Sequence, residues 1–292
     1  MAAQPPPVVV VIATRNRAVE LQETLRRHQD LPGHVGLVVV DNASGDGTVA
    51  RVRRAHPEVR VVALRENLGG AARTVGALHT DCPYVAFSDD DSWWAPGALQ
   101  RAAELLDRHP RLAVVAARVL VGPGELLDPV CAAMASSPLA PAPDLPGRPV
   151  LGFVACGAVV RRSAFLQAGG FHRRFGVGGE EELLAVDLAA AGWGLAYVDE
   201  VVAHHHPSPS RDPAGRQRVQ ARNGLWTLWL RRPAGVALTR TLRALAEALA
   251  SRGPGRRAGL AEALRGLPWV LRARRPLPRE VEADLRRLGG RS

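Results

Sequence analysis

Three consecutive aspartates, Asp89, Asp90 and Asp91, follow a short apolar run and are the residues of this chain best suited to chemistry. Alternate side chains of an extended segment share a face, so Asp89 and Asp91 are expected to address one cation while Asp90 points away. Carboxylate oxygens are ligands that Mg²⁺ and Mn²⁺ prefer, and these ions keep positions open for phosphate oxygens. The alternative is a solvated acidic turn, but three adjacent negative charges at the end of a buried strand favour a bound cation.

A second group of carboxylates, Glu180, Glu181 and Glu182, opens a predicted helix directly after the glycine-rich segment 176–179. One of the three is a candidate general base, because a carboxylate can take a proton from a hydroxyl group. The alternative is structural, since negative charge at a helix N-terminus is favoured by the helix dipole. These residues alone leave both interpretations open.

Two further polar clusters follow predicted strands. Asp41 ends the second apolar run, where its carboxylate can accept a hydrogen bond from a base NH or a ribose hydroxyl, or can instead bond its own backbone in an Asx-turn. Histidines 204–206 follow the last predicted strand, and His204 and His206 are expected to share a face. A role with a metal or a phosphate and a solvated loop are both compatible with this triplet.

The turn after the first predicted strand, Thr14-Arg15-Asn16-Arg17, contains no glycine. A dinucleotide-binding fold needs G-x-G-x-x-G at this place, and a P-loop needs a lysine, which the whole chain lacks. Both common phosphate-binding loops are therefore excluded. If a nucleotide binds, its phosphates need another source of positive charge, and a cation at the aspartates supplies one.

The elements that position these residues alternate between strand and helix. Apolar, β-branched runs predict strands over 8–13, 35–40, 59–64, 84–88, 112–121, 153–160 and 195–202. Periodicity and capping signals predict helices over 18–29, 48–55, 69–79, 96–108, 163–168 and 180–191, with an irregular connection over 122–149. This alternation is typical of an α/β fold with a mostly parallel, Rossmann-like sheet flanked by helices, in which ligands bind at the carboxyl ends of the strands.

Composition limits the class of protein. Hydrophobic residues make up 47% of the chain, which excludes disorder over its whole length. The three cysteines form no C-x-x-C pair, so neither a disulfide framework nor a zinc ribbon is expected. The N-terminus lacks the basic region of a secretion signal, and no apolar run approaches the ~20 residues of a spanning helix. We therefore expect a cytoplasmic protein.

The net charge of +10 is unevenly distributed. Residues 1–206 carry 19 arginines against 22 acidic residues, whereas residues 207–292 carry 19 against 6, a balance of +13. We expect a catalytic body over 1–206 and a basic C-terminal region over 207–292, with helices at 221–232, 236–250, 257–264 and 280–288.

The basic region suggests a partner of negative charge. Trp226 and Trp229 stand beside arginines there, so they either anchor the protein peripherally on an anionic membrane or pack against the body. Nucleic acid is the other anionic partner that the charge suggests. It is not expected, because only 4% of the residues are aromatic and the basic excess lies outside the body.

Seven ordered blocks resemble the motifs of family-2 inverting glycosyltransferases with the GT-A fold, over residues 8–206. They are Thr14-Arg15-Asn16-Arg17, the segment 40–48 around Asp41, the segment 67–73 with Asn67, Gly69 and Arg73, Asp89-Asp90-Asp91, Cys156-Gly157 with Arg161-Arg162, Gly169-Gly170-Phe171, and Glu180-Glu181 with Gly192-Trp193. The pair Arg222-Asn223 resembles a segment that follows the catalytic domain in many such bacterial enzymes.

This resemblance implies a metal-dependent transfer of sugar from a nucleoside-diphosphate sugar to a hydroxyl acceptor, such as a cell-envelope glycan or a lipid-linked acceptor. It implies a nucleotide-sugar part over 8–121 and an acceptor side over 150–206. Donor contacts are implied for Thr14, Asn16, Asp41, Asn67, Gly69, Arg73 and Asp90, and contacts with Mg²⁺ or Mn²⁺ for Asp89, Asp91 and His204. Glu181 stands where the family has its catalytic carboxylate, usually aspartate, with Glu180 and Glu182 as alternatives.

Two other enzyme classes share parts of this pattern. A sugar-phosphate nucleotidyltransferase also combines an α/β core with a metal, but it usually carries a glycine-rich segment in the first turn, which this chain lacks. A glycosidase also uses two carboxylates but has no need of a nucleotide. The sequence therefore favours a glycosyltransferase.

Overall fold

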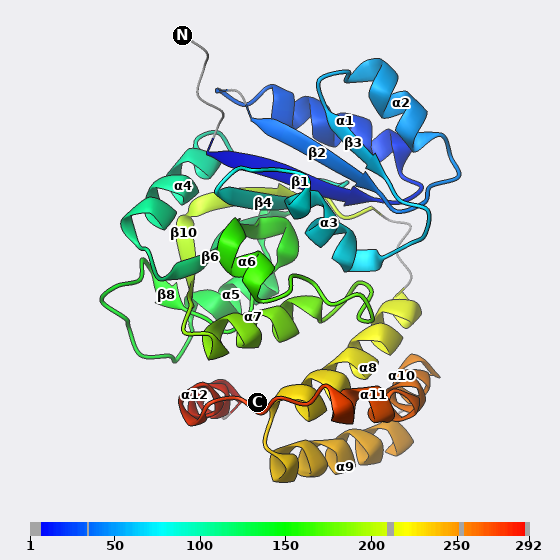
Figure 1. Ribbon diagram of the computed structural model, residues 1–292, viewed down its shortest axis with the longest axis vertical. Helices are drawn as coiled ribbons and strands as arrows, with labels where there is room; N and C mark the ends of the chain where they lie inside the picture. The colour runs from blue at the N-terminus through cyan, green and yellow to red at the C-terminus, as the bar shows by residue number, and fades with distance from the viewer. Residues whose placement is uncertain (1–6, 34, 209–212, 251–253, 290–292) are drawn as a thin grey trace.

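The chain forms an α/β body followed by a group of C-terminal helices (Figure 1). The computed structural model describes residues 7–33, 35–208, 213–250 and 254–289. Its strands are β1 (Val8–Thr14), β2 (Gly36–Asp41), β3 (Arg60–Ala63), β4 (Tyr84–Asp89), β5 (Ser92–Trp94), β6 (Leu112–Val121), β7 (Leu126–Leu127), β8 (Arg148–Pro149), β9 (Ala158–Arg161) and β10 (Gly194–His205). Its helices are α1 (Ala18–Gln29), α2 (Thr48–Ala55), α3 (Ala72–Leu78), α4 (Ala98–Arg108), α5 (Pro129–Ala135), α6 (Arg162–Gln167), α7 (Glu180–Ala190), α8 (Pro213–Arg231), α9 (Ala234–Ala250), α10 (Pro254–Arg265), α11 (Leu267–Arg272) and α12 (Arg279–Gly289).

The strands form one curled sheet in the order β3-β2-β1-β4-β9-β6-β10-β5. The first four strands are parallel neighbours, and β6 pairs in parallel with β10. Strand β9 runs antiparallel between β4 and β6, and β5 runs antiparallel to β10. The predicted mostly parallel sheet flanked by helices is therefore confirmed.

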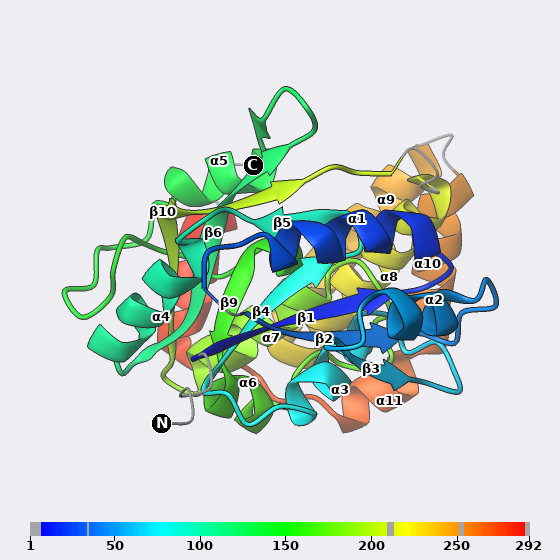
Figure 2. The same ribbon diagram turned by 90° about the horizontal axis from the view of Figure 1, so that it is seen from above.

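Both faces of the sheet are buried, which explains why its strands are apolar without alternation. In β1, Val10 and Ile12 pack with α1, α2 and α4 in one core, whereas Val9 and Val11 pack with α3, α6 and α7 in the other. Seen from above, α1 lies in front of the sheet while α7 and α8 lie behind it (Figure 2). The helices on the two faces hold the strand ends in fixed positions.

The expectation of an irregular connection over 122–149 was wrong. This segment contains β7, α5 and β8. Helix α5 begins with Pro129, and the Asp128 side chain caps it by accepting a hydrogen bond from the Val130 NH over 2.7 Å. Cys131 and Met134 then pack into the core. These elements are too short to display a period.

Two strand boundaries also differ from expectation. The segment predicted as a strand over 153–160 makes a 3-10 turn, η2 (Ala155–Gly157), before β9 begins. Strand β10 continues past Val202 to include two of the three histidines, because β5 pairs with it and places Trp93 opposite His204 and Ser92 opposite His205. Neighbouring residues of a strand point to opposite faces, so His204 and His205 are separated.

The C-terminal helices pack against the body through a shared apolar cluster. Trp226 is 7% exposed and contacts the rings of Phe175 from the body and Trp269 from α11. Its indole NH donates a hydrogen bond to the Ala263 carbonyl over 3.1 Å, and that of Trp229 donates to Thr241. Trp226 is therefore buried, and Trp229 is partly buried against the same cluster. Among the described residues, no helix combines the length and apolar character that a membrane span requires.

Candidate functional site

The polar clusters that follow β1, β2 and β4 lie together at the carboxyl edge of the sheet. Strand β1 pairs with β2 on one side, with Thr14 opposite Asp41, and with β4 on the other, with Ala13 opposite Asp89. The strand order reverses between β1 and β4, and such switch points are where open α/β sheets bind ligands. The expected gathering of these clusters is therefore observed.

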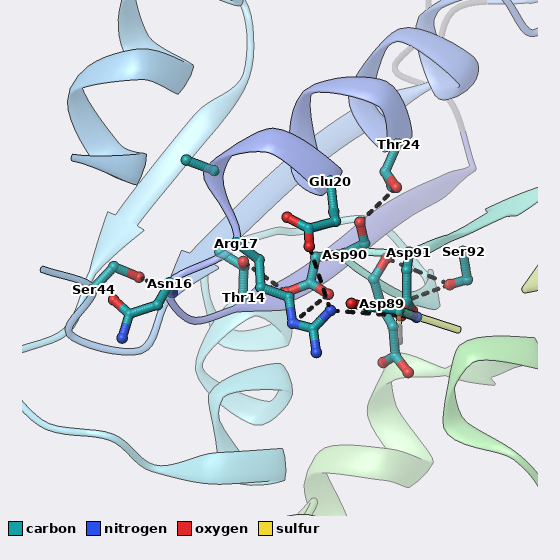
Figure 3. A network of polar contacts seen from close by, with 12 residues as sticks. Thr14, Asn16, Arg17, Glu20, Thr24, Ser44, Asp89, Asp90, Asp91 and Ser92 are labelled. Carbon is teal, nitrogen blue, oxygen red and sulfur yellow. Dashed lines mark hydrogen bonds and ion pairs between the residues drawn. The ribbon is translucent and has the colours of Figure 1, made fainter. Parts of the chain in front are cut away.

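Asp90 is buried beneath the turn that follows β1 (Figure 3). Thr14 Oγ1 donates to Asp90 Oδ2 over 2.9 Å, Thr24 Oγ1 donates to the Asp90 carbonyl over 2.8 Å, and Arg17 Nε lies 3.7 Å from Asp90 Oδ1. Burial raises the pKa of Asp90 to about 7, with the Asp89 charge adding to the shift and the Thr14 hydrogen bond opposing it. Thr14 and Asp90 thus bind each other, and their contact with a donor stays a prediction.

Asp91 is held by the chain that leaves β10. Its Oδ2 accepts a hydrogen bond from the Ser208 NH over 3.1 Å, and its Oδ1 lies 3.2 Å from His205 Nε2. His204, the expected metal contact, is instead paired with Glu125 over 2.9 Å and stacked on Trp93. The strand alternation of β10 therefore assigns the place beside the aspartates to His205 and not to His204.

Arg73 connects the aspartates with the start of α7. Its guanidinium donates to Asp89 Oδ1, and its Nη1 lies 3.7 Å from Glu180 Oε1. Arg73 is 5% exposed and Glu180 only 1%, whereas the Asp89 side chain is 30% exposed and is the most accessible of the three aspartates. Arg73 was expected to border the donor diphosphate, but here its charge is taken up by two carboxylates.

The electrostatics of this bridge are those of a buried ion pair. Burial lowers the pKa of Arg73, but Asp89, Glu180 and Glu181 together raise it above its ordinary value. Burial also raises the pKa of Glu180, the Glu181 charge adds to that shift, and Arg73 opposes it. Each buried charge depends on the other, because an unpaired charge in the interior is costly.

The three glutamates at the start of α7 occupy different surroundings. Glu180 is enclosed, with one carboxylate oxygen accepting a hydrogen bond from the Gly178 NH and the other facing Arg73. Glu182 points toward the C-terminal helices and lines a small cavity with Arg232 and Arg240. Glu181 is half-buried and Glu182 is exposed, and the Glu181 charge acts on Arg73 on the side of the aspartates.

The turn at 67–70 is fixed by backbone contacts. The Asn67 side chain is exposed and accepts from the Gly69 NH, while Asn42 Oδ1 accepts from the Leu68 NH over 3.0 Å. Gly69 has φ +56°, and a Cβ there would lie 2.6 Å from the Gly176 Cα. This turn therefore touches the glycine-rich loop that precedes α7.

The loop after β2 is braced by the turn after β1. Asn16 accepts from the Gly45 NH over 2.8 Å, and its own NH donates to Ser44 Oγ over 2.9 Å (Figure 3). Asp41 Oδ2 accepts from the Ser44 NH, which is the Asx-turn alternative. Its other oxygen, Oδ1, is buried without a hydrogen-bond partner among the described residues, and such an acceptor costs about 1–3 kcal/mol until a donor reaches it.

Three residues of the site carried no role in the sequence interpretation. Arg17 lies between Asp90 and Asp91, and Asn42 fixes the turn at 67–70. Asn223 of α8 holds the loop before α7 by donating to the Phe175 and Gly178 carbonyls. Arg17 and Asn42 lie within two of the seven sequence motifs. The three adjacent negative charges of the aspartates would have suggested that Arg17 lies close to them. The contacts of Asn223 depend on how distant segments pack.

A family model described as glycosyl transferase family 2 matches residues 9–168, which is more than half of the chain. The chain is 29% identical over 218 residues to the N-acetylglucosaminyl-diphospho-decaprenol L-rhamnosyltransferase of Mycobacterium tuberculosis, a match that covers 62% of this chain and 70% of that protein.

Solved structures show the same fold. The mannosyltransferase PcManGT of Pyrobaculum calidifontis, in complex with GDP-Man and Mn²⁺, aligns with a TM-score of 0.59 at 22% identity and covers 99% of this chain and 77% of its own. A fragment of S. aureus TarS in complex with UDP-GlcNAc also gives a TM-score of 0.59, at 16% identity, covering 94% of this chain and 83% of its own. At these identities the likeness supports the fold alone.

Proposed function

Because the chain belongs to glycosyl transferase family 2, we propose that it moves a sugar from a nucleoside-diphosphate sugar to an acceptor hydroxyl in one inverting displacement that depends on a divalent cation. The observation that carries this proposal is the Arg73 bridge, which connects Asp89 at the end of β4 with Glu180 at the start of α7. The acidic motif is thereby connected with the start of α7, where the adjacent Glu181 also acts on the Arg73 charge.

The donor nucleoside is proposed to lie at the ends of β1 and β2. The buried, unpartnered Asp41 Oδ1 supports this placement, because a base NH or a ribose hydroxyl would satisfy it. Asn16 shapes the neighbouring loop, and the turn with Asn67 and Gly69 borders the same edge. Thr14 and Asp90 would act mainly by fixing the position of the acidic motif.

The side chains beside the acidic motif fit a divalent cation. Asp89 and Asp91 offer carboxylate oxygens, and His205 offers an imidazole nitrogen that lies close to both. Oxygen and nitrogen donors of these types hold Mg²⁺ and Mn²⁺. Bound there, the ion would neutralise the donor diphosphate and stabilise negative charge on the leaving phosphate oxygen.

Glu181 is proposed to take the proton from the acceptor hydroxyl. It is less buried than Glu180, and it is not turned toward the C-terminal helices as Glu182 is. Glu180 would keep Arg73 in place and thereby hold Asp89 and α7 at a fixed separation. The acceptor oxygen would attack the anomeric carbon from the face opposite the leaving diphosphate, which inverts the configuration.

A lipid-linked or cell-envelope glycan is proposed as the acceptor, supported by the name of the mycobacterial relative. Peripheral contact with an anionic membrane would bring the enzyme to such an acceptor. The basic region 207–292 supports this contact through its charge of +13, and α9 supports it with two exposed leucines one turn apart, Leu238 and Leu242. Interfacial helices combine exposed apolar residues with arginines in this way.

Donor binding gives the direct test of this function. The full chain would be heated with UDP-GlcNAc, GDP-Man and a nucleotide-linked L-rhamnose, each with Mn²⁺ and with EDTA. We expect one donor to raise the unfolding temperature when Mn²⁺ is present, because a ligand at 100 times its Kd adds about 2.7 kcal/mol to stability. Equal stabilisation by that donor in EDTA would contradict the dependence on a cation. Failure of every nucleoside diphosphate to stabilise the protein would contradict the function.

A further inference from the structure

Cys156 lies against the acidic motif. Ligand atoms of Asp89, Cys156 and His205 all lie within 4.8 Å of one another. Cys156 is 2% exposed and belongs to the turn η2, and its neighbour Gly157 must be glycine because a Cβ there would lie 2.4 Å from a Val119 methyl. The close packing of η2 therefore fixes the position of the Cys156 thiol.

The other buried cysteine of the core has different surroundings. The Cys131 sulfur accepts from the Val119 NH over 3.3 Å and donates to the Ala117 carbonyl over 3.4 Å, so backbone groups satisfy it. Cys156 has a carboxylate and an imidazole beside it instead. Carboxylate, imidazole and thiol are together a recurrent ligand set for transition metals.

The spacing is close to that of a coordinated ion. Zinc-like ions lie about 2.0–2.3 Å from oxygen, nitrogen and sulfur ligands, so three ligands arranged around one ion are separated from one another by no more than about 4.0 Å. A separation of at most 4.8 Å therefore needs only a small side-chain adjustment to close on one ion. An ion can reach the site past Asp89, because the side chain of this residue is 30% exposed.

We infer that Cys156 is a sulfur ligand of the cation site, and that it makes this site select borderline transition-metal ions such as Co²⁺ and Zn²⁺ over Mg²⁺. This inference rests on the proposed cation site at Asp89, and it adds a ligand and a metal preference. Binding releases the thiol proton to solvent as the metal–sulfur bond forms. Mg²⁺ gains nothing from sulfur, because it demands an octahedron of oxygen ligands.

The test titrates Co²⁺ into the full chain without nucleotide and records near-ultraviolet absorption, where a cobalt–thiolate bond gives a charge-transfer band. We expect the band in the natural protein and in Cys131→Ser, and its loss in Cys156→Ser. Replacing the sulfur should weaken Cd²⁺ binding at least as much as losing an outer-shell partner does, about 10–100-fold, while Mg²⁺ binding changes far less.

Cadmium NMR of the unaltered protein gives a second measurement that does not depend on the folding of a variant, because the cadmium shift moves strongly when sulfur is a ligand. A shift typical of oxygen and nitrogen ligands alone, or a cobalt band that persists in Cys156→Ser, would overturn the inference. If Mn²⁺ still supports donor binding in that case, the proposed function stands without the sulfur ligand. A cobalt–sulfur band in a protein that binds no nucleotide donor would support the sulfur ligand and contradict the proposed function.

Discussion

Arg73 connects the acidic motif with the start of α7. It is almost fully buried, and its partners Asp89 and Glu180 come from β4 and α7, elements that lie far apart in the chain. A buried pair of this kind is weak evidence for net stability, but removal of one partner leaves an uncompensated charge inside the protein. The start of α7, where the proposed base lies, is therefore connected with the acidic motif through Arg73.

Replacing Arg73 should lower the free energy of unfolding far more than replacing an exposed arginine. We expect Arg73→Met to lower the free energy of unfolding by about 3–5 kcal/mol, and Glu180→Gln in that background to restore part of it by removing a stranded charge. Arg111→Met is the matched control, because its exposed pair with Asp144 should contribute no more than about 1 kcal/mol. Denaturant unfolding of the natural protein, the two single variants and the double variant measures these free energies. Equal losses for Arg73→Met and Arg111→Met would contradict the bridge.

Individual site residues were predictable where a local pattern marks them. Asp89, Asp90 and Asp91 follow a short apolar run, and that position alone predicts that they lie at the carboxyl edge of a parallel sheet. Which histidine lies beside the aspartates was not predictable, because the choice between His204 and His205 depends on how far β10 continues and thus on the strand alternation. The contacts of Arg73 were not predictable, since no local signal states which buried carboxylates an arginine will meet.

At the scale of elements, the glycine-rich loop before α7 is held from two sides. The Gly70 NH donates to the Gly176 carbonyl over 2.8 Å, and Asn223 of α8 donates to the Phe175 and Gly178 carbonyls. The loop therefore connects the turn at 67–70 with the start of α7. The close backbone approach at Gly69 leaves no room for a side chain.

A methyl group at position 69 should disturb this contact. Gly69→Ala combines a left-handed backbone with a Cβ 2.6 Å from the Gly176 Cα, whereas Gly33→Ala meets the same kind of backbone, φ +89°, with no atom within 4 Å. We expect Gly33→Ala to lower the stability of the protein by about 1–2 kcal/mol, which is the strain of the left-handed backbone. Gly69→Ala should lower it further and should also weaken donor binding. Thermal unfolding and donor titration measure both. Matching losses of stability in the two variants would show that the contact with Gly176 has no effect.

Elements with a clear local pattern were predictable, and several of the short ones without such a pattern were not. The runs that became β1, β2 and β6 and the helix over 18–29 carry enough residues for a pattern to be unambiguous. Strand β5 has three residues and follows the aspartates directly, so its sequence resembles a turn until β10 pairs with it. Helix α5 left only its Asp-Pro start as a signal.

At the scale of the whole molecule, the C-terminal region is joined to the body and also presents an outer surface. Trp226 packs on Phe175, and Arg231 forms an ion pair with Asp187 of α7. Helix α9 lies on the side of these helices that is farthest from the sheet (Figure 1). Its leucines Leu238 and Leu242 are 52% and 58% exposed. The charge of this region was evident from the sequence, but the inward packing of its tryptophans depends on the assembled fold.

This surface predicts salt-sensitive binding to anionic vesicles. Substituting both Leu238 and Leu242 with serine should weaken that binding by about tenfold or more, because each buried leucine contributes about 1.5–3 kcal/mol. Serine at Leu126 and Leu127, which are also exposed but lie in β7, is the matched control and should leave vesicle binding unchanged. Co-sedimentation with the vesicles measures each protein. Equal sedimentation of the two double variants would exclude α9 as the contact.

The proposed reaction depends on Glu181 as the base, in a site that binds the donor independently of this residue. The most direct measurement compares single-turnover sugar transfer and donor affinity in Glu181→Gln and Glu182→Gln. We predict that Glu181→Gln loses about 10²–10⁴-fold in transfer rate with an unchanged Kd for the donor, and that Glu182→Gln transfers normally. Transfer by Glu181→Gln at the rate of the natural protein would contradict the account.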